Sequence, residues 1–516
     1  MIDPKPQTEL DPELLALLRP FDDHNRSLLD NVHPPTWVNP TPADRYHLVV
    51  IGAGTAGLVS AAGAAGLGAR VALIERRLMG GDCLNYGCVP SKGIIRAARA
   101  WHDAREASRR FGGPTVNDDA DFATVMERMR RLRAGISRLD SAQRFRDLGV
   151  DVFLGEGRFV AGDAIEVAGQ RLRFRRAIVA TGARPVAPPI PGCDEGCYLT
   201  NETLFTLTRL PRRFGVIGAG PIGCEISQTF ARFGSQVTLF DMAPHVLVRE
   251  DADAAEIVQR AMVDDGVHLE LGVKVLEIQT TPDGKIVHFE RDGERGQTTI
   301  DELLVAVGRA PNVEGIGLDA AGVEYDKLGV RVNDRLQTTN KRIWAVGDVA
   351  TRYKFTHTAD ALARIAIQNS LFFGRAKASD LVIPWCTYTS PEIGHVGLYE
   401  GEAKDRGFAV ETLTIDLKDV DRAVLDSQEE GFLRLLVQTG KDRILGATIV
   451  AEHAGDILGE LSLAVTAGVG LNQIAATIHA YPTQAEVVKK AADTWSRGKL
   501  TPMVKKVFSI FFKIFR

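Results

Sequence analysis

One stretch decides the fold of this chain: residues 48–57 read LVVIGAGTAG. Its apolar run predicts a strand buried on both faces, and Gly52, Gly54 and Gly57 predict a tight turn into a helix. The next apolar run ends at Glu75, 23 positions after the first of these glycines. This spacing predicts a dinucleotide site, with the pyrophosphate at the helix N-terminus and the ribose hydroxyls on the acidic side chain.

The same pattern occurs a second time. Residues 214–217 lead into Gly218, Gly220 and Gly223, and an acidic residue, Asp241, again follows 23 positions after the first glycine. Two such units predict two α/β dinucleotide-binding domains and two separate cofactors.

A cysteine pair follows residues 52–57, the first of the two glycine fingerprints. Residues 80–92 read GGDCLNYGCVPSK, which places Cys83 and Cys88 five positions apart, just before a Pro-Ser-Lys helix start. A cofactor held by the first fingerprint would lie within reach of these thiols. A structural cysteine pair or half of a zinc site is the alternative interpretation.

This combination resembles the flavoprotein disulfide reductases, the family of dihydrolipoyl dehydrogenase, glutathione reductase and mercuric reductase. The resemblance covers about residues 45–495. It implies an FAD- and NAD(P)H-dependent oxidoreductase that passes electrons through a redox-active Cys83–Cys88 disulfide, in a homodimer whose active site is shared across the interface. The implied fold class is α/β, with two Rossmann-type dinucleotide-binding domains and an α+β C-terminal dimerisation domain.

We expect five segments along the chain. They are an N-terminal extension (1–44), an FAD-binding domain (45–185 and 312–382), an NAD(P)H-binding domain (186–311), a dimerisation domain (383–495) and a basic amphipathic tail (496–516). In the extension, residues 14–18 favour one short helix, and the prolines after it favour an extended linker. Residues 128–138 are rich in arginine and predict a solvated basic helix face.

The resemblance assigns FAD to the first fingerprint and implies further contacts. Asp348 would bind the ribityl chain, and Thr356 with His357 would lie near the pyrimidine end of the flavin. Asp82 stands where relatives usually carry threonine, which departs from the expected phosphate contact. The remaining implied FAD contacts are Gly81, Lys92, Gly157, Thr181, Gly182 and Gly347.

The second fingerprint is expected to hold the nicotinamide cofactor, with Gly308 at its nicotinamide half. Asp241 favours NADH, because a carboxylate at this position binds a free 2′-hydroxyl and repels a 2′-phosphate. NADPH stays open as the alternative, since Arg249 lies nearby in the sequence and could pair with a phosphate.

The resemblance also divides the chemistry among the site residues. It places Cys88 against the flavin, where it forms a charge-transfer complex, and makes Cys83 the interchange thiol that meets the acceptor. Lys92 and Glu225 are expected to pair beside flavin N5. We expect the helix that begins near Cys88 to lower the pKa of its thiol.

Composition narrows the function and the location. The chain has 516 residues and a net charge of −4, which argues against a general nucleic-acid-binding protein. Six cysteines do not make a secreted disulfide framework, and no apolar run is long enough to span a bilayer. We expect a cytoplasmic protein with no bound metal. The other four cysteines are predicted to be structural, with a metal site at the first two as the alternative: Cys193, Cys197, Cys224 and Cys386.

The acceptor is the least defined part of the prediction. Disulfide-reducing relatives carry a proton-transferring histidine in a His-Pro-Thr stretch, with a glutamate five residues later. Here residues 478–486 read IHAYPTQAE, so Tyr481 replaces the histidine and Glu486 keeps the place of the acid. Tyrosine, with a pKa of about 10, is a poor base at neutral pH, and His479 is the alternative base.

Mercuric reductases also carry tyrosine near this position, but they pass the metal through a cysteine pair near the C-terminus. The last cysteine here is Cys386. We therefore favour a soft metal ion or thiol–metal complex as acceptor. A dihydrolipoyl-type dithiol or a low-molecular-weight disulfide is the alternative, so the chain would then be a dihydrolipoyl dehydrogenase or a disulfide reductase.

Residues 503–516 predict an unusual terminal helix. Its polar residues fall within about a 100° arc, and apolar residues fill the rest. This pattern suits a membrane interface, or a helix that docks on the protein itself or on its dimer mate. A membrane-docked electron-transfer subunit for a partner protein is therefore the hypothesis of another class. The polar arc consists of Lys505, Lys506, Ser509, Lys513 and Arg516.

Overall fold

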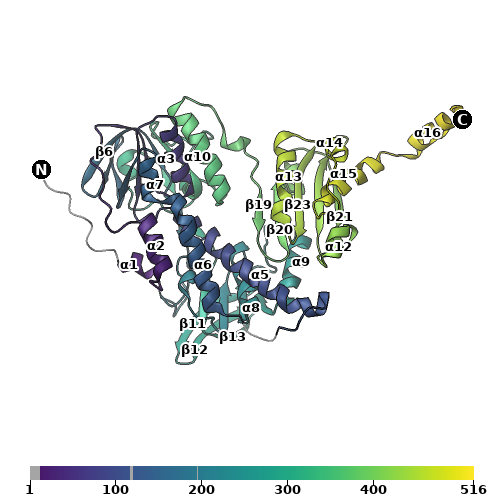
Figure 1. Ribbon diagram of the computed structural model, residues 1–516, viewed down its shortest axis with the longest axis horizontal. Helices are drawn as coiled ribbons and strands as arrows, with labels where there is room; N and C mark the ends of the chain where they lie inside the picture. The colour runs from purple at the N-terminus through teal and green to yellow at the C-terminus, as the bar shows by residue number, and fades with distance from the viewer. Residues whose placement is uncertain (1–11, 117–119, 195, 516) are drawn as a thin grey trace. The chain divides into compact units, whose positions relative to one another are not determined.

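The structure is a computed structural model, and it describes residues 12–116, 120–194 and 196–515 (Figure 1). The chain divides into two compact units. The first consists of the described residues of Met1–Arg105, Val116–Met242 and Val267–Asp380. The second consists of the described residues of Glu106–Thr115, Ala243–Gly266 and Leu381–Arg516.

The first fingerprint follows one strand, β1, of a seven-stranded sheet. Its strand order is β3-β2-β1-β6-β5-β4, with β18 also paired to β6. Strands β3, β2, β1, β6 and β18 are parallel, and β5 and β4 continue the sheet in antiparallel pairs. The bounds are β1 Tyr46–Ile51, β2 Val71–Glu75, β3 Val150–Leu154, β4 Gly157–Ala161, β5 Ala164–Val167, β6 Gln170–Val179 and β18 Ile343–Ala345.

The second fingerprint lies in a four-stranded parallel sheet of order β10-β9-β8-β14. A three-stranded antiparallel sheet, β11-β12-β13, and two short ribbons, β15-β7 and β16-β17, complete the strands of this unit. The bounds are β7 Ala183–Pro185, β8 Arg213–Ile217, β9 Gln236–Asp241, β10 Val267–Leu271, β11 Lys274–Thr281, β12 Gly284–Arg291, β13 Glu294–Ile300, β14 Glu302–Val305, β15 Arg309–Pro311, β16 Tyr325–Asp326 and β17 Gly329–Val330.

Helices follow the strands as the two fingerprints predict. Helix α3 comes after β1 and packs against α10, and α8 comes after β8 (Figure 1). The α/β part of the predicted fold class is thereby confirmed. The bounds are α1 Pro12–Ala16, α2 Asp23–Val32, α3 Thr55–Gly66, α4 Gly81–Asn85, α5 Cys88–Phe111, α6 Phe122–Ser137, α7 Ala142–Asp147, α8 Pro221–Phe233 and α10 Thr356–Leu371.

The third glycine of each fingerprint lets its helix approach the end of its strand. A Cβ on Gly57 would lie 1.7 Å from the carbonyl oxygen of Gly52, and a Cβ on Gly223 would lie 1.7 Å from that of Gly218. No side chain fits at either distance, so the two turns share one steric requirement.

The N-terminal extension packs on the first unit through a helix that the sequence did not predict. Helix α2 lies against α6 (Figure 1). Asp22 caps α2 and accepts a hydrogen bond from Nε of Arg130 at 2.6 Å, and Asn25 accepts one from Nη2 of Arg133 at 2.8 Å. These two arginines are 7% and 1% exposed. The prediction of a solvated basic face is therefore wrong for both of them.

The segment after α2 is also held in place. The indole of Trp37 donates to the carbonyl of Val152 at 3.1 Å, and Asn39 exchanges two hydrogen bonds of 2.9 and 2.8 Å with the backbone of Leu154. Both backbone partners belong to β3, the outermost strand of its sheet. The predicted linker thus covers an edge that would otherwise expose unpaired backbone groups.

The second unit is α+β, as predicted. Its antiparallel sheet has the order β19-β20-β23-β22-β21, and α13 packs on β20 and β23. No described helix of either unit is both long and apolar enough to cross a bilayer. The bounds are β19 Trp385–Thr387, β20 Glu392–Gly397, β21 Val410–Asp416, β22 Phe432–Gln438, β23 Ile444–Ala451, α9 Ala252–Asp264, α11 Glu400–Asp405, α12 Asp421–Leu425, α13 Ala454–Ala467, α14 Leu471–Ala476, α15 Glu486–Gly498 and α16 Pro502–Ile514.

Candidate active site

The redox segment, residues 80–92, places its cysteines on two helices. Cys83 lies in the single turn of α4, and Cys88 begins α5. At the start of α4, Gly81 has a φ of 56°, in the left-handed region, and a Cβ there would lie 2.7 Å from the Cα of Gly54. The glycines ahead of Cys83 therefore let this segment lie directly on the first fingerprint.

The two cysteines are thiols in the structure, not a disulfide. A hydrogen bond from the Cys83 thiol, with help from Thr356 and the charge of Lys92, lowers the pKa of Cys88 to about 6 against the opposing effect of burial. The Oγ1 atom of Thr356 lies 3.4 Å from the Cys88 sulfur. The same bond and burial raise the pKa of Cys83. At neutral pH the reduced pair is thus a Cys88 thiolate beside a Cys83 thiol.

The lowered Cys88 pKa agrees in direction with the prediction, but its main cause differs. We expected the helix N-terminus to act, whereas the largest effect comes from the neighbouring thiol. The fall of the Cys88 pKa and the rise of the Cys83 pKa therefore have one common origin, which is the proton that the two sulfurs share.

Lys92 and Glu225 form an ion pair, with Nζ 2.7 Å from Oε2. Lys92 lies one turn after Cys88 on α5, and Glu225 lies on α8 with its side chain 6% exposed. A buried carboxylate needs such a partner, so the pair holds the ammonium group on the thiolate side of α5.

Asp82 belongs to a short network of charges. Its carboxylate contacts the guanidinium of Arg309, whose Nε lies 3.9 Å from Oδ2 of Asp348. Burial raises the pKa of Asp348, and Arg309 and Lys354 oppose this shift. The acid that replaces the usual threonine is therefore neutralised within the site, so it does not present an unpaired charge to a phosphate.

Three parallel strands end together beside this network. Ile51 of β1, Val179 of β6 and Ala345 of β18 are aligned in register. The fingerprint glycines follow the first strand, Thr181 and Gly182 follow the second, and Gly347 and Asp348 follow the third. Open α/β sheets bind their ligands outside the carboxyl ends of the strands.

Further predicted FAD contacts lie around this edge. Thr181 donates to the carbonyl of Asn312 at 2.7 Å, and the Asn312 amide donates back to the carbonyl of Thr181 at 2.9 Å. A Cβ on Gly157 would press on β2, and a Cβ on Gly347 would press on α3. The residues fit the edge of an FAD site because small or internally bonded groups line it.

The acid that ends the second strand of each fingerprint bonds to its own glycine loop. Oε2 of Glu75 accepts a hydrogen bond from the backbone N–H of Ala53 at 2.7 Å, and Oδ2 of Asp241 accepts one from Ala219 at 2.5 Å. The sequence assigned these acids to ribose hydroxyls. The structure adds that each carboxylate also fixes the loop, and a carboxylate oxygen can accept more than one hydrogen bond.

The second fingerprint, which is predicted to hold the nicotinamide cofactor, is more open than the first. A Cβ on Gly220 or on Gly308 would meet nothing within 4 Å. Arg249, the residue that could pair with a 2′-phosphate, is exposed and belongs to the second unit, whereas Asp241 belongs to the first.

The predicted proton-transfer residues lie in the second unit. The Tyr481 hydroxyl donates to Oδ2 of Asp421 at 2.9 Å, and this bond raises the pKa of the phenol, with the charge of Glu486 adding to the rise. His479 instead contacts Glu460: its Nε2 lies 2.9 Å from a carboxylate oxygen of that residue, and its side chain is 9% exposed. The structure therefore brings Tyr481 and Glu486 near one another and gives His479 a different partner.

Sequence reasoning missed one residue that braces the redox segment. The amide of Asn201 donates to the carbonyl of Tyr86 at 3.3 Å and accepts from Nη1 of Arg309 at 3.4 Å. Tyr86 lies between the two cysteines. No local motif marks Asn201, because its partners are more than 100 positions away in the chain.

Comparisons with known proteins agree with this geometry. The chain matches the family model described as pyridine nucleotide-disulphide oxidoreductase over residues 46–363, and the model of that family's dimerisation domain over residues 383–492. It is 36% identical to a mercuric reductase from Lysinibacillus sphaericus over 460 residues, which are 88% of this chain and 83% of that protein. It is 30% identical to a dihydrolipoyl dehydrogenase from Bacillus subtilis over 469 residues, which are 87% of this chain and 98% of that protein.

A solved structure is also similar. The Cu(II) complex of RclA, an HOCl-induced flavoprotein disulfide reductase from Escherichia coli, has a TM-score of 0.77 and 28% identity, and the match covers 86% of this chain and 98% of that one. The matches show an oxidoreductase that uses FAD and NAD(P)H, and the dimerisation domain supports a homodimer. The chain belongs to the pyridine nucleotide-disulphide oxidoreductase family.

Proposed function

We propose that this flavoprotein disulfide oxidoreductase reduces a thiophilic metal ion or a thiol–metal complex with electrons from NADH. The observation that carries the proposal is the state of Tyr481. Its hydroxyl donates to Asp421, and this bond raises the pKa of the phenol. A phenol of this kind cannot take up a proton at neutral pH, whereas exchange with an organic disulfide needs a group that transfers protons.

A thiophilic ion avoids this requirement, because it binds the sulfur itself and displaces the thiol proton to solvent. When bound, FAD supplies the two-electron connection between NADH and the cysteine pair. Cys83 is the thiol that meets the acceptor, and Cys88 is held as a thiolate by Cys83, Thr356 and Lys92. As the Cys83–Cys88 bond forms again, two electrons pass to one Hg(II) ion or to two Cu(II) ions.

Two relatives support this acceptor class. One is a mercuric reductase at 36% identity, and another has a structure with Cu(II). Dihydrolipoyl dehydrogenase relatives at 30% identity keep a dithiol or a small disulfide as the second candidate. The preference for NADH rests on Asp241, whose carboxylate repels a 2′-phosphate.

An acceptor panel tests the proposal directly. Purified FAD-loaded protein is assayed with NADH or NADPH against Hg(II) and Cu(II) with excess thiol, lipoamide, glutathione disulfide and a soluble quinone. We expect kcat/KM to be highest for a metal ion and to vanish in Cys83→Ser, while Cys386→Ser, a matched change outside the redox segment, keeps it. Higher kcat/KM with lipoamide or glutathione disulfide than with either metal would reject the metal assignment.

A second experiment isolates the tyrosine. Tyr481→His should raise the rate with lipoamide by about tenfold or more, with a pH optimum near the histidine pKa of about 6.5, and leave metal reduction nearly unchanged. Tyr481→Phe is the control, because it removes the hydroxyl without adding a base. Equal gains in both variants would show that the hydroxyl blocks the site rather than failing as a base.

We also propose that α16 places the enzyme on an anionic membrane surface. None of the residues of this helix is buried, and its phenylalanine rings contact one another. Residues 494–515 contain no aspartate or glutamate but several lysines, so the charge of the segment favours an anionic surface such as acidic lipid. Arg516, the last residue of the predicted polar arc, lies outside the described residues.

Sedimentation with vesicles tests this second proposal. We expect full-length protein to bind vesicles of phosphatidylcholine with phosphatidylserine and to bind less as salt rises. Exchanging Phe511 and Phe512 for serine should weaken binding about 100-fold or more, since each buried ring contributes about 1.5–3 kcal/mol. Exchanging Lys505 and Lys506 for glutamine should weaken it less, because each lysine contributes about 1 kcal/mol.

Two results would contradict the membrane role. Full-length protein that does not bind these vesicles rejects the lipid surface as the partner of α16. If deletion of residues 501–516 instead dissociates the dimer, the helix is a contact between two copies of the chain. NADH oxidation is the control in both cases, because the deletion removes no redox residue.

A further inference from the structure

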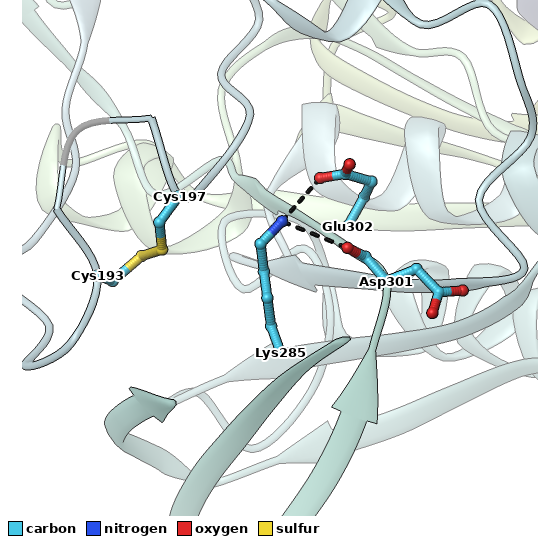
Figure 2. The surroundings of a disulfide bond; sticks show 5 residues. All are labelled: Cys193, Cys197, Lys285, Asp301 and Glu302. Carbon is cyan, nitrogen blue, oxygen red and sulfur yellow. Dashed lines mark hydrogen bonds and ion pairs between the residues drawn. A yellow bond between two sulfur atoms is a disulfide. The ribbon is translucent and has the colours of Figure 1, made fainter. Parts of the chain in front are cut away.

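A disulfide joins Cys193 and Cys197, on the segment that leads from β7 toward the second fingerprint, and their Cα atoms are 5.5 Å apart (Figure 2). It is the one disulfide among the described residues. No group of three or more metal-binding side chains was found in the described part of the chain. The sequence left a metal site open here, and the structure instead shows a bond between the two sulfurs.

The ends of this segment are held without help from the disulfide. On one side, the backbone N–H of Ile278 donates to the carbonyl of Pro191 at 2.9 Å. On the other side, Leu199 donates to the carbonyl of Leu303 at 2.6 Å and accepts from Val305 at 2.9 Å. Two strands, β11 and β14, therefore fix the path of the chain on both sides of the cysteine pair.

The loop between these anchors is exposed at three described positions, and its two cysteines also pack against a hydrophobic cluster that includes Ile278 and Val305. Gly192, Asp194 and Gly196 are exposed, and the two cysteines are half-buried. A small molecule can therefore approach the bond from outside. The charged groups drawn around it are Lys285, Asp301 and Glu302 (Figure 2), and the Lys285 ammonium donates to a Glu302 oxygen at 2.8 Å.

A crosslink of this kind lowers the conformational entropy of the unfolded chain only slightly. Its two cysteines are only four positions apart, and the loss of unfolded-state entropy falls as the closed loop becomes shorter. Because hydrogen bonds already anchor both ends, the fold does not depend on the bond. An accessible disulfide with a small structural contribution is suited to opening and closing.

We propose that Cys193 and Cys197 form a second thiol–disulfide exchange site, which low-molecular-weight thiols such as glutathione open to a dithiol and glutathione disulfide closes again. A thiolate of the small thiol attacks one sulfur, which breaks the Cys193–Cys197 bond and forms a mixed disulfide. A second small thiol then attacks the mixed disulfide and leaves as part of a small disulfide. Two electrons and two protons pass from the two small thiols to the cysteine pair.

The site also has a route to the active site within the first unit. Cys197 lies four residues before Asn201, whose amide bonds to the carbonyl of Tyr86 between the two redox cysteines. Leu199, between them, is fixed to β14. Opening the disulfide frees the loop that ends at this anchor, and a shift of the anchor would reach Asn201, so the rate at which NADH reduces the Cys83–Cys88 pair provides a readout of the exchange.

Thiol trapping in glutathione buffers tests the proposal on the full-length holoenzyme. Anaerobic samples are equilibrated at graded ratios of [GSH]²/[GSSG], alkylated and digested, and trypsin separates the two cysteine pairs because Lys92 and Arg176 lie between them. We expect the Cys193–Cys197 peptide to pass from about one-tenth to nine-tenths dithiol over roughly a 100-fold change in this ratio, reversibly and with FAD retained. Cys386, on a separate peptide, serves as the control thiol and should be alkylated equally throughout.

Three results would overturn it. The pair could stay oxidised in every buffer that leaves FAD bound, which would make the bond a permanent crosslink. The pair could stay reduced in the most oxidising buffer, so that no exchange site exists. The change could occur only together with FAD loss, which would report unfolding. None of these results depends on the acceptor, so they are independent of the metal-reduction proposal.

A variant then tests the route to the active site. We expect the protein with Cys193→Ser and Cys197→Ser to bind FAD and to oxidise NADH, because neither cysteine belongs to the redox segment. The rate at which NADH reduces the Cys83–Cys88 pair should match that of the wild-type enzyme in its dithiol form and differ from that of its disulfide form. Identical rates in all three samples would refute the coupling through Asn201.

Discussion

At the first fingerprint, the redox segment lies over the glycine loop. The backbone N–H of Gly80 donates to the carbonyl of Ala53 at 2.8 Å, and a Cβ on Gly54 would lie 3.7 Å from the Cα of Gly81. At the second fingerprint, a Cβ on Gly220 would meet nothing within 4 Å. The two loops otherwise share the same third-glycine contact and the same bond from the acid to the loop.

The comparison separates two properties of a dinucleotide site: where the dinucleotide binds, and how easily it leaves. The glycines and the acid determine where a dinucleotide can bind, and these are alike at both fingerprints. What lies over the loop determines how easily the dinucleotide leaves. A covered loop suits FAD, which stays through many turnovers, and an open loop suits a nicotinamide cofactor that must exchange in each one.

The largest effect is expected from breaking the two turns separately. Gly57→Ala and Gly223→Ala each place a methyl group against a carbonyl oxygen. We expect Gly57→Ala to give colourless protein without turnover, and Gly223→Ala to give yellow protein that NADH reduces at least about 100-fold more slowly. Absorbance after gel filtration and stopped-flow reduction measure the two losses. Loss of FAD from both variants would remove the distinction between the two fingerprints.

The redox segment also brings a thiolate to the first fingerprint only. Because the pKa of Cys88 is lowered to about 6, its thiolate is present above that pH and is lost as the pH falls through it. We expect the long-wavelength thiolate–flavin band of the two-electron-reduced enzyme to follow this titration and to vanish in Cys88→Ala. Cys83→Ala should raise the midpoint most, since the Cys83 thiol is the largest cause, and Thr356→Val should raise it by about one unit or less. A band that does not change between pH 5 and 8 contradicts the assignment.

The two acids provide a smaller test. Asp241→Asn keeps an oxygen for the Ala219 N–H but removes the charge, so the ratio of kcat/KM for NADH over NADPH should fall about tenfold, and Asp241→Arg should reverse it. Glu75→Gln is the matched control at the first fingerprint and should leave this ratio unchanged. Steady-state kinetics with both cofactors measures it, and a wild-type preference for NADPH would show that the carboxylate does not select.

The smallest effect is expected from removing a contact between the N-terminal extension and the rest of the first unit. Asn25→Ala leaves the buried Arg133 guanidinium without one acceptor, a loss of about 1–3 kcal/mol. The temperature at which heating releases FAD should fall by a few degrees. Ser27→Ala, on the exposed side of the same helix, is the control and should not lower it. Equal release temperatures in all three proteins would mean that the extension does not stabilise this unit.

The features that depend on residues close together in the chain were predictable from the sequence. The two fingerprints, the acids at their second strands and the cysteines of the redox segment are each read within about 25 residues, and the α/β fold follows from them. Contacts across the chain were not predictable in the same way. Thr356 meets Cys88 across 268 positions, and Arg133 meets Asn25 across 108.

The incorrect predictions have a related cause. An arginine-rich helix is usually solvated, so the sequence predicted that Arg130 and Arg133 face water. The acceptors that allow their burial come from Asp22 and Asn25 in a segment without a family motif. The pair Cys193 and Cys197 is a separate case, because a spacing of four positions fits a disulfide as well as the metal site that was left as the alternative, and only the path of the backbone distinguishes the two.

The buried guanidinium of Arg133 has a consequence for how the molecule opens. It donates to Asn25 of α2 and, at 2.7 Å, to the carbonyl of Asn85, the last residue of the helix that carries Cys83. Neither helix can separate from it without leaving a charged group unsatisfied in the interior. In native-state hydrogen exchange, α2 and α4 should therefore gain and lose protection as one cooperative unit, so that a helix of the N-terminal extension and the reactive thiol share one opening free energy.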